Sequence, residues 1–198
     1  MVIAAITVPA VLNSLQNQEF KVGYKKAFSD LSQAAAEGVA FGEFPYRDVK
    51  RSNEIALEEW TIIKNKFGTA KVCENNIGTN DCWIDADRIC TGSCGGGGML
   101  TGKTFIDLQG RAWMLYIRSE NIYLVDTNGD KGPNQFGKER WIFTFAEGNG
   151  KRICDGGDFT NCNNPGTPKK IIPYLTDIKT KHSWCQHPAC YYKSWLIN

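Results

Sequence analysis

Oxygen-bearing side chains at alternating positions of the segment Asp126-Thr-Asn128-Gly-Asp130 are the first candidates for chemistry in this sequence. Carboxylate and amide oxygens on a tight turn suit a hard cation, and Glu139 can return another oxygen at the next strand. The spacing departs from an EF-hand loop, because Lys131 stands where glycine is expected. An Asx-rich turn that bonds its own amides is the alternative. We therefore expect either a calcium site formed by Asp126, Asn128, Asp130 and Glu139, or such a turn.

A phosphate-binding pattern occurs in the middle of the chain. Residues Gly97 to Thr104 satisfy G-x-x-x-x-G-K-[ST], the pattern of a loop that cradles phosphate groups. Such a loop needs a buried strand before it and a helix after it, so that helix N-terminal amides meet the phosphate. Here Cys90 and Cys94 precede the pattern, and residues 104–117 alternate like a β-hairpin. We expect no nucleotide site here.

Four residues of zinc-ligand type lie close together near the end of the chain, namely His182, Cys185, His187 and Cys190. The alternative is a small disulfide loop that carries two exposed histidines. Thiols in an oxidising compartment pair with each other, so the disulfide loop is favoured over a zinc site.

The cysteines indicate an oxidising compartment. They form an even set that is absent from the N-terminal helix, as in a disulfide framework. Short loops favour the pairs Cys154–Cys162 and Cys185–Cys190, and pairing in sequence order adds Cys73–Cys82 and Cys90–Cys94, although the connectivity stays open. The eight are Cys73, Cys82, Cys90, Cys94, Cys154, Cys162, Cys185 and Cys190.

The rest of the composition favours neither catalysis nor binding to polyanions. Both histidines lie in the last cysteine segment, so no serine or cysteine nucleophile has an obvious general base. The net charge is +2, from 23 basic and 21 acidic residues spread along the chain. We therefore expect neither an enzyme nor a nucleic-acid partner.

The elements that carry these motifs begin with an uncharged segment, Met1 to Gln18, which runs into a long amphipathic helix. Exposed apolar surface costs about 25 cal/mol per Å², so a bilayer or neighbouring copies are expected to cover it. The apolar run from Met1 to Leu12 is shorter than the ~20 residues that span a bilayer. We expect the apolar helix to continue upstream of Met1. A helix buried within a compact monomer is the alternative.

The helix has a predicted interruption, a predicted end and one packing stripe. Pro9 predicts a kink or a melted stretch, and the helix should end at Gly42 to Phe44, ahead of Pro45. Apolar residues at steps of three and four predict the stripe. Its members are Phe20, Tyr24, Ala27, Leu31, Ala34, Gly38 and Phe41.

A second helix and a sheet are expected after it. The helix should run from Asn53 to Phe67, with Gly68 as its stop and Ile55, Trp60, Ile63 and Phe67 facing inward. Turns at Gln109-Gly110 and Glu120-Asn121 indicate an antiparallel meander, whose last strand alternates like a half-buried strand. The strand-like runs are Lys103 to Leu108, Ala112 to Ile117, Ile122 to Asp126 and Arg140 to Phe145.

This organisation resembles the type IV pilin and pseudopilin family. The segment VIAAITVPAVLNSLQNQEFKVGYKKAFSDLSQA is similar to the second half of the family's N-terminal helix, with Pro9 at the family's kinking proline. The segment IYLVDTNGDKGPNQFGKERWIF is similar to a strand, glycine-rich turn and strand that are common in bacterial pilin-like proteins. The two motifs occur in the family's order.

The resemblance implies an α+β fold. A helix at residues 1–44 would form the filament core and pack on a head at residues 45–198. The head would comprise a helix-to-sheet loop (45–102), an antiparallel sheet of about four strands (103–145) and a disulfide-stapled C-terminal lobe (146–198). The residues expected in the core bundle are Val2, Ile3, Ile6, Val8, Pro9, Val11, Leu12 and Leu15.

The resemblance also implies a function and partners. Subunits would wait in the inner membrane and then polymerise into an extracellular filament, with the assembly machinery of a type IV pilus or of type II secretion as partner. Some pseudopilins hold calcium in a comparable loop, which supports the calcium interpretation. The alternatives are a pseudopilin of a type II secretion system and a helix-anchored binding module or adhesin.

Overall fold

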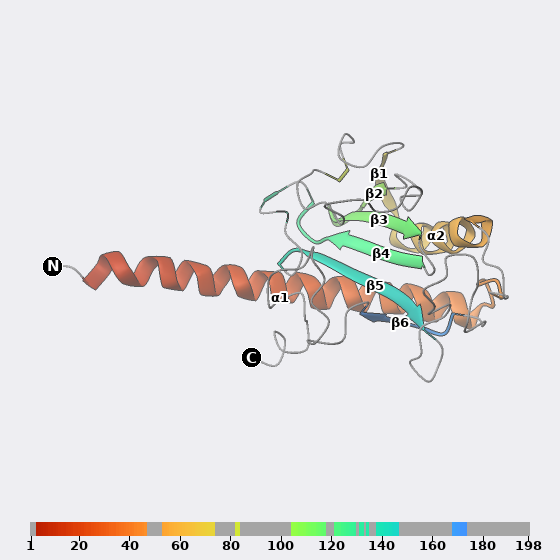
Figure 1. Ribbon diagram of the computed structural model, residues 1–198, viewed down its shortest axis with the longest axis horizontal. Helices are drawn as coiled ribbons and strands as arrows, with labels where there is room; N and C mark the ends of the chain where they lie inside the picture. Colours follow the sequence, from red (N-terminus) through yellow and green to blue (C-terminus); the bar gives the residue numbers. More distant parts are fainter. Residues whose placement is uncertain are drawn as a thin grey trace, which may run out of the picture.

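The computed structural model describes residues 3–46, 53–73, 82–83, 104–117, 121–129, 131–132, 134, 138–146 and 168–173. These residues form an α+β fold with an antiparallel sheet of six strands (Figure 1). The long helix α1 (Ile3–Ala40) and the shorter α2 (Asn53–Phe67) pack on the sheet. The first part of α1 extends away from the sheet, and its last part lies against it.

Helix α1 runs without interruption through Pro9, and Figure 1 shows no sharp bend along this helix. The melted stretch expected at this proline is therefore absent. A proline removes one main-chain hydrogen bond, and the bonds of the adjacent turns carry the helix across it.

Helix α1 ends at Ala40, just before the segment Gly42 to Phe44 where its end was expected, and a Schellman motif closes it. The amide of Glu43 donates to Gly38 O at 2.9 Å, and that of Gly42 donates to Val39 O at 3.1 Å. Gly42 adopts a φ of 66°, which favours glycine. The turn leaves Phe41 76% exposed, so its predicted place in the packing stripe is wrong. Phe44 packs on Gly38 instead.

Helix α2 has the predicted bounds. It ends before Gly68, whose φ is 67°. Trp60 and Ile63 are buried in the core, and Phe67 packs against it. The salt bridge from Lys66 Nζ to Glu43 Oε2, at 2.8 Å, ties the end of α2 to the turn that follows α1.

The sheet has six strands where about four were expected. Every neighbouring pair is antiparallel and the order follows the chain, so the predicted meander is confirmed and extended at both edges. The added strands are short: β1 comes from the segment assigned to a loop, and β6 from the predicted C-terminal lobe. The strands are β1 (Thr69–Cys73), β2 (Thr104–Asp107), β3 (Ala112–Ile117), β4 (Asn121–Asp126), β5 (Arg140–Ala146) and β6 (Lys170–Pro173).

The core lies between the helices and one face of the sheet. Tyr24 of α1 packs edge-on against Trp141 of β5, with ring centroids 4.7 Å apart. On α2, Trp60 packs against Phe105 of β2 at 5.2 Å and against Tyr123 of β4 at 6.0 Å. Helix α1 therefore covers the β5 side of the sheet, and α2 covers the β2 to β4 side.

The opposite face of the sheet is also buried. Met114, Leu124 and Thr144 have no exposed surface, although Met114 and Leu124 lie outside the core cluster that the helices share with the sheet. Strand β5 is buried at every residue, so the half-buried strand predicted from its alternation is wrong. Successive residues of β5 lie on opposite faces of the sheet, and both faces are buried. One face carries the large aromatic residues of the strand, and the other carries Arg140.

Candidate functional site

The first described side chains of α1 form an exposed surface. Residues 12–19 are all exposed, and Leu12 and Leu15 keep 53% and 50% of their surface in contact with solvent. Val22 is 64% exposed even though α1 is already packed on the sheet at Tyr24. Six of the predicted core residues lie outside the described side chains: Val2, Ile3, Ile6, Val8, Pro9 and Val11.

These exposed apolar residues lie on a different face of α1 from the residues that pack on the sheet. An α-helix turns about 100° per residue, so Leu12, Leu15 and Val22 fall within about 80° of one another. The buried residues from Tyr24 to Ala34 point about 130° away from them. Helix α1 thus has two apolar faces, and among the described residues only the face that packs on the sheet is buried.

The turn between β2 and β3 contacts α1 through a buried arginine. Arg111 Nε donates to Asp107 Oδ2 at 2.7 Å, and Arg111 Nη1 lies 2.8 Å from Asp30 Oδ2 of α1. Trp113 Nε1 also donates to Asp107 Oδ2, at 2.9 Å. The other oxygen, Oδ1, accepts the amides of Gln109 and Arg111, which closes the turn. Arg111 therefore joins the helix to the hairpin through two carboxylates.

The turn after β4 repeats this arrangement. Arg140 Nε donates to Asp126 Oδ2 at 2.7 Å, and the Asn128 amide donates to Asp126 Oδ1 at 3.3 Å. Thr127 reaches α1 at Gly23, where an added Cβ would lie 2.9 Å from Thr127 Oγ1. Since Gly23 precedes Asp30 by about two helical turns, the two turns hold neighbouring points on one face of α1.

Asp126 is buried beside Arg140, and the two are linked by the ion pair described above. Burial raises the pKa of the Asp126 carboxyl above its usual value, and the hydrogen bond and charge of Arg140 oppose this effect.

Three of the four predicted calcium residues, Asp126, Asn128 and Glu139, lie in the described part of the chain. Asp126 is engaged by Arg140, Asp130 lies outside the described residues, and Glu139 is buried. Asn128 Oδ1 is buried without a hydrogen bond, while its Nδ2 donates to Gly132 O at 3.4 Å. Among the described residues no three acidic, histidine or cysteine side chains gather into a metal site. Calcium binding stays a prediction, and the Asx turn at Asp126 is observed.

Cys73 and Cys82 form a disulfide, one of the pairings expected from sequence order. The bridge holds the next residue, Trp83, against the second face of the sheet. There the Arg140 guanidinium lies over the Trp83 ring, 4.5 Å from its centroid. The other predicted pairings lie outside the described residues: Cys90–Cys94, Cys154–Cys162 and Cys185–Cys190.

The two remaining motifs fall mostly outside the described residues. Of the phosphate-binding pattern only Thr104 is described, and it begins strand β2 where a phosphate loop would begin a helix. The histidines and cysteines of the predicted zinc set, at positions 182, 185, 187 and 190, are all outside.

Sequence reasoning missed the clamp formed by Arg111, Asp30 and Asp107. One signal was present: Asp107 lies near the end of an expected strand and precedes the turn residue Gly110, the usual position of an Asx turn. Nothing in the spacing indicates that Asp30, far away on the helix, meets the same arginine. The stacking of Trp83 on Arg140 depends on a disulfide pairing and a strand register, and the sequence alone determines neither.

No protein-family model, curated protein or solved structure matches this chain. In the part of the chain that the structure describes, no helix has both the length and the apolar character needed to cross a membrane.

Proposed function

We propose that this protein is a structural subunit of an extracellular, type IV pilus-like filament and that it polymerises through helix α1. The observation that carries the proposal is the second apolar face of this helix, marked by Leu12, Leu15 and Val22. The first face packs on the sheet of its own subunit. The second is solvent-exposed in the monomer and is available to the α1 helices of neighbouring copies.

The spacing of the exposed face suits helix-to-helix packing. Leu12, Leu15, Glu19 and Val22 follow one another at steps of three, four and three, the spacing of a helix seam. Fully burying one such apolar side chain contributes about 1.5–3 kcal/mol. Each helix in a bundle has several neighbours, so this contribution is repeated along a filament. Glu19 places one charge within the stripe, and a charge at such a position favours one register over others.

The contacts between α1 and the two turns suit a subunit that transmits force from its head to its helix. Asp30 and Gly23 are held by two separate turns, so α1 cannot swivel about a single contact. A helix fixed in this way has the same orientation relative to the head in every copy, so its outer face always points in the same direction. Regular polymers require this reproducible geometry, because an identical contact must repeat between successive subunits.

The test is filament formation by a paired substitution in cells that produce the protein. We expect Leu12→Asp with Leu15→Asp to abolish the filaments seen by electron microscopy, because two charges would enter the helix bundle. Leu108→Asp is the matched control, because Leu108 is an exposed leucine on the head. Filaments of normal yield from the Leu12→Asp/Leu15→Asp variant would contradict the proposal. A wild-type protein that stays monomeric would favour a helix-anchored binding module.

A further inference from the structure

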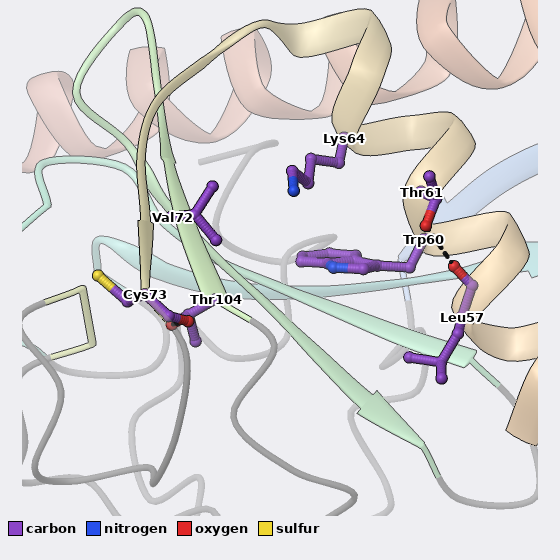
Figure 2. Close-up of a pocket in the computed structure, with 7 residues that line it drawn as sticks. All are labelled: Leu57, Trp60, Thr61, Lys64, Val72, Cys73 and Thr104. Atoms are coloured by element: carbon purple, nitrogen blue, oxygen red, sulfur yellow. Dashed lines mark hydrogen bonds between the residues drawn. The ribbon is translucent and has the colours of Figure 1, made fainter.

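A pocket of about 290 Å³ lies between α2 and the edge strand β1 (Figure 2). It is close to the lower end of the volumes, about 300–1,000 Å³, that small-molecule sites occupy. One wall comes from a single side of α2, and the other from the end of β1 and the start of β2. The lining residues are Leu57, Trp60, Thr61, Lys64, Val72, Cys73 and Thr104.

The body of the pocket is apolar and rigid. The Trp60 indole extends from α2 toward Val72 on the opposite wall, and Leu57 lies one helical turn from Trp60. The Trp60 ring is packed from behind by Phe105 and Tyr123, at centroid distances of 5.2 and 6.0 Å. The indole is therefore a preformed wall for a flat apolar group.

The two hydroxyl groups of the pocket are already bonded to the main chain. Thr61 Oγ1 donates to Leu57 O at 2.8 Å, and Thr104 Oγ1 donates to Cys73 O at 3.2 Å. A hydroxyl has one proton to donate, so neither is a free donor for a ligand.

Lys64 is the cation of the pocket. Its side chain extends from α2 into the space between Trp60 and Val72. Among the described residues, the Lys64 side chain takes part in no ion pair or hydrogen bond, whereas that of Lys66 on the same helix pairs with Glu43 at 2.8 Å. An ammonium group has three protons to donate and attracts an anion.

The geometry points to a binding site for a small monocarboxylate with a flat, apolar body. The body lies along Trp60, Leu57 and Val72, and the carboxylate accepts hydrogen bonds from Lys64 Nζ. One cation on an apolar surface favours a single negative charge over a phosphate, which has more charge and more acceptors than this pocket can satisfy. The inference does not depend on filament formation, because every residue it uses belongs to one head.

Benzoate and its uncharged analogue benzamide test the site by NMR titration of the full chain. We expect benzoate to shift the Trp60 indole N–H and the Val72 amide. We expect benzamide to bind about tenfold more weakly, because the analogue lacks the charge that pairs with Lys64. Trp60→Phe identifies the indole signal. Lys64→Gln should weaken benzoate by about the same tenfold and leave benzamide unchanged, whereas Lys25→Gln, an exposed lysine of α1, should change neither.

Three results would overturn the inference. The first is the absence of a benzoate-dependent shift at Trp60 and Val72 up to the solubility limit. The second is equal affinity for benzoate and benzamide. The third is benzoate binding that Lys64→Gln leaves unchanged, which would place the ligand elsewhere on the protein.

Discussion

The carbonyl oxygen of Gly110 lies 2.6 Å from the position that a Cβ on Gly129 would occupy. Gly110 belongs to the turn between β2 and β3, and Gly129 to the turn after β4. The two turns that hold α1 are therefore packed against each other, main chain to main chain. Each turn is closed by an aspartate that accepts an arginine Nε at 2.7 Å. The clamp on α1 is one unit, formed by two turns of the same design.

Gly129→Ala should be the most damaging of the glycine substitutions in this unit. Gly129 has a φ of 72°, and a methyl group there would also meet a main-chain oxygen that cannot rotate away. We expect a loss of about 2–4 kcal/mol in the free energy of unfolding, measured by urea denaturation. Gly110→Ala, with a φ of 81° but open space around it, should cost only the backbone strain of about 1–2 kcal/mol. Equal losses in the two variants would show that the turns do not touch.

Arg111→Met should cost more than Asp30→Asn. Removing the arginine leaves the buried Asp107 carboxylate without its cation, a change that costs about 3 kcal/mol or more. Asp30 is partly exposed, so solvent screens its pair with Arg111 and its loss should cost about 0.5–1 kcal/mol. A double-mutant cycle on urea midpoints measures the coupling, with Glu37→Gln as the control on the same helix. A coupling energy of zero would show that Asp30 of the helix and Arg111 of the hairpin do not stabilise each other.

The titration of Asp126 should lower the free energy of unfolding as the pH rises above the pKa that this carboxyl has in the unfolded state. Burial raises the pKa of Asp126 in the folded protein above the usual 3.8, so the folded state binds its proton more tightly than the unfolded state. Between those two pKa values the unfolded state loses its proton first, and this group's contribution to stability declines as pH increases. Thermal unfolding from pH 3 upward should show this slope in the wild type and lack it in Asp126→Asn. The same slope in both proteins would assign it to other groups.

Much of the fold was predictable because short-range sequence patterns determine it. Helix α2 has its predicted bounds, since its apolar spacing and Gly68 are both short-range signals. Strands β1 and β6 were missed because five and four residues hold too little alternation to distinguish them from loops. The exposure of Phe41 was missed because the Schellman turn rotates it off the stripe.

The site was less predictable than the fold. The exposed leucines on α1 were identified from sequence, because an apolar helical stretch without charges is visible in the residues themselves. The clamp required the pairing of β2 with β3 and the packing of α1 on the sheet, which brings Asp30 to Arg111 and Asp107 across a long stretch of chain. Burial of the second face of the sheet was equally hidden, because Arg140 and Thr144 read as solvent-facing residues until their neighbours are known.

Removing the Cys73–Cys82 disulfide should release Trp83 from Arg140. Cys73→Ser with Cys82→Ser opens a short loop, which costs about 2–3 kcal/mol in the loop-entropy account. Trp83 should then become more exposed, so acrylamide should quench its fluorescence more strongly than in the oxidised wild type. The Trp83 signal is the difference between each protein and the same protein with Trp83→Phe. The control is Trp83→Phe in the oxidised protein, which keeps the bridge. Unchanged quenching of Trp83 after loss of the bridge would show that the disulfide does not position it.

The most direct test of the central claim is photo-cross-linking from position 15 of α1 in cells that produce the protein. A photoreactive amino acid in place of Leu15 should cross-link to α1 of a neighbouring copy, as mapped by mass spectrometry, because this face is proposed to pack in the filament core. The same amino acid in place of Leu108, which is exposed on the head, should give no α1-to-α1 product. Products that join position 15 only to other proteins, or no product at all, would contradict assembly through this helix.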